Sequence, residues 1–149
     1  MNLSQKCQYG LRAMFELAKR NSQGPLSIPQ IAEAQAIPPR FLEQILTQLK
    51  HAGYVESRRG VQGGYLLAST PYEVTVGEII RLFEGPLSPV KCLAGQGGGD
   101  CPLLGDCAFI ELWERAQAAV EEVYDSTSLQ DLIDRERAAA ARRTVNFCI

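Results

Sequence analysis

The sequence predicts a mainly α fold with a small β-hairpin and a long helix in its C-terminal half. Three stretches before residue 53 carry apolar residues at helical spacing, and two short apolar stretches then flank a glycine-rich turn at 58–64. A sustained apolar stripe follows between residues 109 and 124. The length of 149 residues and the 46% share of hydrophobic side chains suit one small domain with an extension.

The first two expected helices carry clear start and stop signals. Ser4 is a residue type that caps helices, and the sequence NSQGP at 21–25 ends the first helix. Ser27 precedes Gln30 by the spacing of a capping box, which predicts a short second helix that the AIPP sequence at 36–39 ends. The apolar positions of the first helix are Cys7, Leu11, Met14, Phe15 and Ala18.

The third expected helix begins at Pro38 and Pro39 and stops at Gly53. It separates into two faces. Arginine and glutamine side chains can pair with guanine and adenine edges, and glutamate can accept a hydrogen bond from cytosine, so the polar face predicts contact with DNA bases. The apolar face holds Phe41, Leu42, Ile45, Leu46 and Leu49, and the polar face holds Arg40, Glu43, Gln44, Thr47, Gln48 and His51.

Two short strands, at 54–57 and 64–68, are expected around the turn RRGVQGG. The turn carries Arg58 and Arg59, which could reach a minor groove or DNA phosphates. Three helices followed by a basic hairpin is the order of a winged helix-turn-helix. The charge distribution agrees: residues 1–60 carry a net charge of +4 and residues 85–149 a net charge of −4, within a total of −2.

The C-terminal half predicts a dimer. Thr75 and Glu78 form a second capping box, and the long apolar stripe beyond residue 109 has little of its own chain to cover it, so a homodimer interface is expected; folding back onto the first domain is the alternative. We divide the chain into a DNA-binding domain at 1–84, a cysteine-rich loop at 85–108, a dimerisation helix with a short final helix at 109–136, and a flexible tail at 137–149.

Three of the five cysteines lie in one glycine-rich stretch, CLAGQGGGDCPLLGDC. Without a secretory signal or a membrane-spanning stretch, a cytoplasmic location is expected, where thiols stay reduced and clustered cysteines serve as metal ligands or redox sensors. The long spacers between Cys92, Cys101 and Cys107 suit an iron–sulfur cluster, of two-iron or four-iron form. Zinc, a disulfide and idle cysteines remain alternatives.

Together, LSQKCQYGLRAM, PPRFLEQIL, SRRGVQGGYLL, VTVGEII and the three-cysteine loop resemble the IscR/NsrR-type family of bacterial winged-helix transcription regulators, over about residues 1–135. The resemblance implies a nucleoid-associated homodimer that binds double-stranded DNA. It also implies cluster ligation by Cys92, Cys101 and Cys107, and DNA contact by Arg40, Glu43, Gln44 and Arg59.

The fourth cluster ligand departs from the family pattern. Ile110 stands where the iron–sulfur regulator of the family has a histidine, and Gln8 stands where nitric-oxide sensors offer an aspartate from the partner subunit. Cys7 of the partner subunit is a candidate replacement, although its place in an apolar stripe favours a buried position. Cys148 is a further candidate.

The predicted function is a homodimeric transcription regulator, a repressor that senses iron–sulfur, redox or nitric oxide status through a cluster on the three-cysteine loop. The alternative is a cluster-free regulator of the same fold, controlled by thiol oxidation, zinc or a partner protein. An enzyme is not expected, because the sequence offers no phosphate-binding glycine loop and no nucleophile with an adjacent base.

Overall fold

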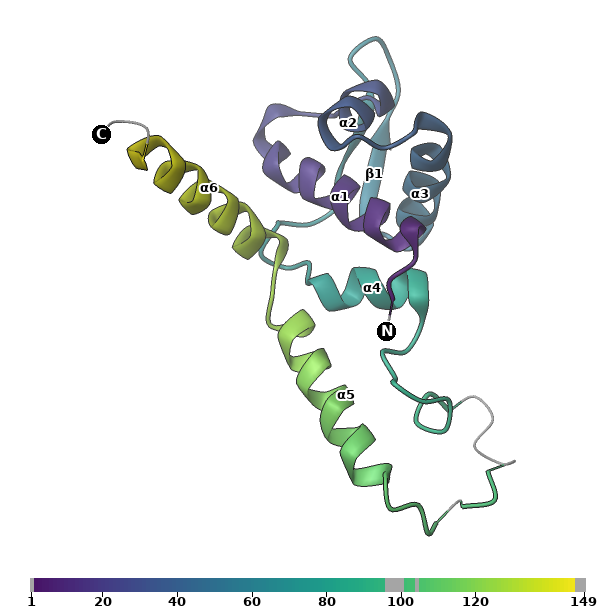
Figure 1. Ribbon diagram of the computed structural model, residues 1–149. Coiled ribbons are helices and arrows are strands. Elements are labelled where there is room, and N and C mark those ends of the chain that lie inside the picture. The colour runs from purple at the N-terminus through teal and green to yellow at the C-terminus, as the bar shows by residue number, and fades with distance from the viewer. Residues whose placement is uncertain (1, 96–100, 104, 147–149) are drawn as a thin grey trace.

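The computed structural model describes residues 2–95, 101–103 and 105–146. The first three helices and the hairpin gather into one body, α4 lies against that body, and the last two helices extend from it (Figure 1). The elements are α1 (Gln5–Lys19), η1 (Asn21–Gln23), α2 (Ile28–Gln35), α3 (Pro39–His51), β1 (Val55–Arg58), β2 (Gly64–Leu67), α4 (Val76–Glu84), α5 (Ile110–Asp125) and α6 (Leu129–Asn146).

The helix starts are those that the sequence predicts. The Ser4 hydroxyl accepts a hydrogen bond from the backbone amide of Cys7 at 3.2 Å at the start of α1. Both capping boxes form, one at the start of α2 and one at the start of α4, and in each the cap and the third helical residue bond reciprocally. Pro39 occupies the first turn of α3, where a proline removes no helical hydrogen bond.

One core joins α1, α2, α3, the hairpin and the first half of α6. Helix α3 contributes Leu42, Ile45, Leu46 and Leu49, which are all buried. Phe41, the fifth member of the expected apolar face, is the exception: its side chain remains 54% exposed and lies beside the ring of Tyr9. Phe41 thus belongs to the apolar face by spacing but not to the core, although its neighbour Leu42 is fully buried.

The wing is a two-stranded antiparallel hairpin in which Val55 pairs with Leu67 and Arg58 with Gly64. Leu26 extends this sheet, because its backbone amide and carbonyl both bond to Tyr65 at 2.8 Å. Gly64 makes this approach possible, since a side chain there would overlap the carbonyl of Leu26. The base of the wing is thereby fixed to the segment that leads into α2.

Helix α5 joins the body through α4. Arg81 holds Asp125 with two hydrogen bonds of 2.6 and 2.8 Å, and Gly77 leaves the space that the aspartate occupies. Among the described residues, α5 has no buried side chain, and Leu112 and Val123 are 52% and 61% exposed. Of the apolar stripe, Tyr124 packs against the cluster of Cys7, Val76, Ile80 and Leu87, whereas Leu112 and Val123 remain uncovered.

The final helix is longer than expected. Leu129 and Ile133 anchor its start in the core, and α6 then continues to Asn146. The predicted flexible tail is therefore wrong for residues 137–146; the alanines at 138–141 have the highest helix propensity and sustain the helix. Residues 147–149, with Cys148, lie outside the described residues. No helix in the described part of the chain is long and apolar enough to cross a membrane.

Candidate nucleic-acid interface and cysteine pocket

The exposed side of α3 presents polar side chains to solvent. Its opposite side is anchored in the core by four leucine and isoleucine side chains, which fixes the direction of the polar side. Within that side lies a shallow groove of about 390 Å³. Four of the residues predicted to contact DNA line this groove: Arg40, Glu43, Gln44 and Thr47. We call these four residues the recognition surface.

Two side chains of the predicted polar face have partners within the protein. The Thr47 hydroxyl donates to the carbonyl of Glu43 at 2.9 Å, along the helix itself. The Gln48 amide, which is half-buried, donates to the carbonyl of Leu82 at 3.2 Å and so fastens α3 to α4. His51 is exposed at the end of α3. Helical spacing places Gln48 with the polar residues but does not reveal that α4 lies against it.

The arginines at the predicted interface are free cations. Arg40, Arg58 and Arg59 are exposed, and within the described ranges none of them forms an ion pair. Arg20 and Arg81, by contrast, are held by carboxylates elsewhere in the fold. Arginines without a carboxylate partner attract a polyanion without first having to break an internal ion pair.

The three loop cysteines line one pocket. Cys92, Cys101 and Cys107 surround a space of about 140 Å³ whose other walls are Leu103, Gly105 and Ile110. Cys92 and Cys101 are exposed, Cys107 is half-buried, and all three are free thiols. Ile110, where the family resemblance would place a histidine, contributes an apolar wall to the same pocket.

The donor set of this pocket suits a soft metal centre. Three thiols without a hard oxygen ligand among the pocket walls match the preferences of iron–sulfur clusters and zinc. Within the part of the chain that the structure describes, however, no three such side chains are close enough together to hold a metal ion. Gly97, Gly98 and Gly99 of the glycine-rich stretch lie outside the described residues.

Cys7 has a different environment. Its side chain is fully buried in a small apolar cluster with Val76, Ile80 and Leu87. Burial raises the pKa of the Cys7 thiol to about 11, and the nearby carboxylate of Glu84 adds to this increase. The thiol is therefore protonated at neutral pH, which disfavours metal ligation, because the thiolate is the metal ligand.

Thiol alkylation tests this difference. At pH 8, iodoacetamide should modify Cys92, Cys101 and Cys107 in metal-free protein well before Cys7, because only a thiolate reacts and Cys7 is both buried and protonated. Peptide mass spectrometry over a time course measures the order of modification. Denatured protein is the control, in which the four cysteines should react at similar rates. Early modification of Cys7 in the folded protein would contradict its assignment to the core.

Hydrogen bonds join α5, which begins at the cysteine pocket, to α4, and α4 to α3. Helix α5 starts at Ile110 in the pocket wall and ends at Asp125, which Arg81 of α4 holds. Arg81 also lies 3.7 Å from the carboxylate of Glu121, and Ser88 donates to Gln117 at 2.8 Å. Gln48 of α3 in turn donates to the carbonyl of Leu82 of α4, so α4 contacts both α5 and α3.

Comparison with known proteins finds relatives that are transcriptional regulators. Residues 3–135 match the Rrf2 family, described as an iron-dependent transcriptional regulator. The HTH-type transcriptional regulator CymR of Bacillus subtilis is 45% identical over 132 residues, which cover 89% of each chain. A putative HTH-type transcriptional regulator of Mycobacterium tuberculosis, Rv1287, is 37% identical over 133 residues, 89% of this chain and 81% of that protein.

Solved structures show the same fold. CymR, described as the global cysteine regulator of B. subtilis, has a TM-score of 0.76 at 42% identity, with 91% of this chain and 98% of that chain covered. IscR of T. potens has a TM-score of 0.76 at 37% identity, with coverages of 93% and 90%. The oxidized form of Staphylococcus aureus CymR has a TM-score of 0.68 at 36% identity, with coverages of 89% and 96%. The family is one of transcriptional regulators and not of enzymes.

Proposed function

Because the chain belongs to the Rrf2 family of transcriptional regulators, we propose that it is a homodimeric repressor whose affinity for operator DNA depends on the chemical state of the cysteine pocket. The observation that supports the proposal is that one chain has both the recognition surface and the cysteine pocket. The recognition surface offers base-pairing side chains, and the pocket of Cys92, Cys101 and Cys107 lies at the start of α5, which is tied to the DNA-binding body.

The DNA contacts follow from the chemistry of the exposed groups. Arg40, Glu43 and Gln44 read base edges in the major groove, while Arg58 and Arg59 contact the minor groove or the phosphates from the wing. A second copy covers the exposed apolar side chains of α5, and the resulting two-fold symmetry matches a palindromic operator. Thr47 lies within the recognition surface, His51 is exposed at the end of the same helix, and Gln48 fastens that helix to α4.

Cys92, Cys101 and Cys107 hold an iron–sulfur cluster in this proposal. When bound, the cluster supplies a redox-active group that also crosslinks the loop. The protein's own residues supply three thiolates and the apolar walls of Leu103 and Ile110, which limit access of water. The fourth ligand is left open, since the burial and raised pKa of Cys7 argue against it.

Thiol oxidation is the second candidate mechanism, and specific observations favour it. Cys92 and Cys101 are exposed free thiols, the accessibility that a redox-sensing cysteine needs. The chain is also similar to S. aureus CymR, of which an oxidized form has been crystallised. In this variant of the proposal a peroxide oxidises one loop thiol to a sulfenic acid and is itself reduced to water, and a second loop thiol then displaces water from the sulfenic acid to form a disulfide, without a metal.

Metal analysis separates the two mechanisms. Protein purified without oxygen should contain iron and acid-labile sulfide near stoichiometric amounts per monomer if the pocket holds a cluster, and the measurement is elemental analysis with a sulfide assay. Zinc in place of iron, or neither metal, would contradict the cluster. In that case, loss of free thiols upon mild oxidation, measured at Cys92, Cys101 and Cys107, would support the thiol mechanism.

A further inference from the structure

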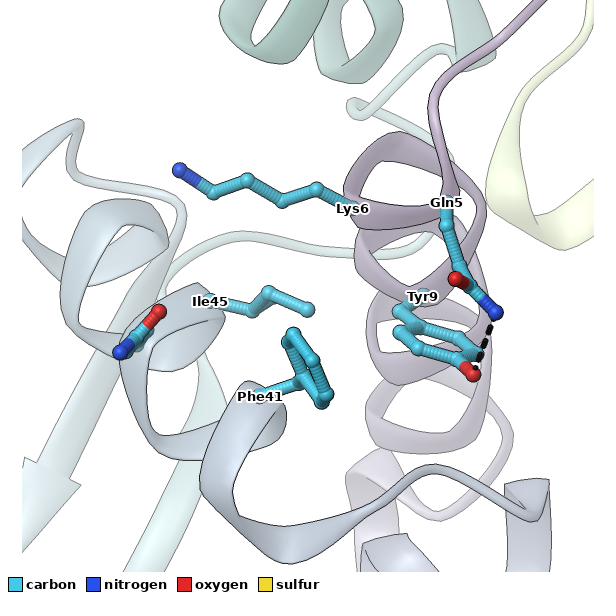
Figure 2. A pocket seen from close by; sticks show the side chains of 6 residues that line it. Gln5, Lys6, Tyr9, Phe41 and Ile45 are labelled. Atoms are coloured by element: carbon cyan, nitrogen blue, oxygen red, sulfur yellow. Dashed lines mark hydrogen bonds between the residues drawn. The ribbon is translucent and has the colours of Figure 1, made fainter.

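A second pocket lies beside the recognition surface, between α1 and α3. It measures about 140 Å³ and is lined by Gln5, Lys6, Tyr9, Phe41, Gln44 and Ile45 (Figure 2). Gln44 belongs both to this pocket and to the recognition surface, so the two hollows are neighbours on α3. Figure 2 shows Tyr9 of α1 facing Phe41 of α3, and the two ring centroids are 6.2 Å apart.

Hydrogen-bond donors follow the exposed side of α1 at this pocket. Gln5, Tyr9 and Arg12 stand at i, i+4 and i+7, and Lys6 lies next to them. The cationic groups of Lys6 and Arg12 have no carboxylate partner in the described part of the chain; they lie 5.8 Å from the Phe83 ring and 6.0 Å from the Tyr9 ring. Rings hold these cations in place without neutralising them.

The hydroxyl of Tyr9 accepts one hydrogen bond within the protein and can donate another. Gln5 Nε2 lies 2.9 Å from the Tyr9 oxygen, which it meets as a donor (Figure 2). Because that oxygen accepts a bond from the amide, its own proton is free for an acceptor outside the protein. The acid nearest this end of α1, Glu84, is occupied by the backbone amide and the hydroxyl of Ser4.

The geometry of a recognition helix in the major groove indicates which DNA groups lie near these donors. A helix is about 10–12 Å in diameter with its side chains, and the major groove is about 12 Å wide, so an element packed beside a recognition helix lies at the wall of the groove, where the phosphates are. Tyr9 and Phe41 contact each other at the N-terminal end of α3, the end of a recognition helix that contacts base edges. The exposed ring of Phe41 suits an apolar sugar edge.

We propose that Lys6, Tyr9 and Arg12 form a second DNA contact, which binds the phosphates of the strand along the α1 side of the recognition helix. We call these three residues the phosphate surface. This inference rests on the proposed DNA-binding function and adds to it a contact independent of base sequence. It also gives a role to Phe41, which the fold leaves exposed: its ring lines the pocket that Lys6 and Tyr9 share.

Salt-dependent binding tests the inference. Fluorescence anisotropy follows the binding of full-length protein to a labelled duplex that the wild-type protein has enriched from a random pool. The variants Lys6→Gln and Arg12→Gln should each reduce the magnitude of the slope of log affinity against log salt by about 2 for the bound dimer, because each removes one phosphate-neutralising cation per subunit. Tyr9→Phe, which removes only the hydroxyl, should weaken binding to this duplex and to a scrambled duplex by the same factor.

Lys19→Gln is the matched control, because Lys19 lies on the same helix but is paired with Glu136 at 2.9 Å. It should bind with the wild-type slope. If Lys6→Gln and Arg12→Gln also keep the wild-type slope while Arg40→Ala weakens binding, the proposal of a phosphate surface is wrong and the proposed DNA-binding function stands. If wild-type protein enriches no duplex, the proposed function fails as well. Far-ultraviolet circular dichroism confirms that each variant is folded.

Discussion

The Arg40→Ala variant is expected to bind its selected operator about 1–3 kcal/mol more weakly per half-site than the wild-type protein, whereas its affinity for a scrambled duplex should change much less. Arg40 is exposed on the recognition surface and has no ion-pair partner among the described residues, so the substitution removes a base contact without disturbing the core. Parallel titrations of the two duplexes at one salt concentration measure the effect.

Arg137→Ala provides the comparison for this prediction. Arg137 is an exposed arginine of α6, whose only ion-pair contact among the described residues is a long one of 3.9 Å to Asp134. Its removal changes the net charge by the same amount and should leave both affinities near the wild-type values. Equal weakening on both duplexes by Arg40→Ala would show that Arg40 contacts phosphates and not bases, and an unchanged affinity would remove Arg40 from the interface.

The Cys101→Ser variant should lose the response to the signal while keeping DNA binding. Cys101 is one of three thiols around the cysteine pocket, and a hydroxyl is a poor substitute both as a soft ligand and as an oxidisable group. We expect no cluster in this variant, and a single operator affinity before and after treatment with an oxidant. Anaerobic metal analysis and operator titration in both conditions provide the measurement.

Cys7→Ala serves as the matched cysteine substitution, because Cys7 is buried away from the pocket and has a raised pKa. It should retain the cluster and the response, with some loss of stability from the small cavity that it leaves. A Cys7→Ala variant that loses iron as completely as Cys101→Ser would make Cys7 a cluster ligand and contradict its purely structural role in the core. A Cys101→Ser variant that still responds would place the sensor elsewhere.

Local patterns in the sequence predicted the elements well. The caps at Ser4, Ser27 and Thr75 form as expected, because a cap depends on residues only three positions apart. The glycine-rich wing likewise carries its turn information in consecutive residues. The C-terminal end of α6 was not predicted. The stretch after Glu136, which is rich in alanine and arginine, looks like a surface tail, although its alanines sustain the helix.

Contacts between elements were harder to predict. Helical spacing placed Phe41 on the apolar face and Gln48 on the polar face of the third helix, yet Phe41 is exposed beside Tyr9 and Gln48 binds the carbonyl of Leu82. A periodic pattern gives the direction of a side chain around its own helix and contains nothing about the neighbour it meets. The proposed DNA contact of α1 likewise has no signal in the sequence, since it depends on the pocket that Tyr9 forms with residues of α3.

The cysteine pocket illustrates the same limit. The spacing of Cys92, Cys101 and Cys107 identified a soft donor set, and the structure places the three thiols around one space. The link from this pocket through Asp125 and Arg81 to α4 depends on residues that are 44 positions apart, and no sequence motif marks it. The contact that joins α5 to α4 is therefore visible only in the fold.

If the state of the cysteine pocket sets operator affinity, one comparison shows it most directly. Wild-type protein purified without oxygen is titrated onto its selected duplex, and the titration is repeated after exposure to air or diamide. We expect two different dissociation constants at the same salt concentration, with the original value returning after anaerobic reduction or reconstitution. Identical dissociation constants in both states would leave a DNA-binding protein without a cysteine-based sensor and contradict the proposal.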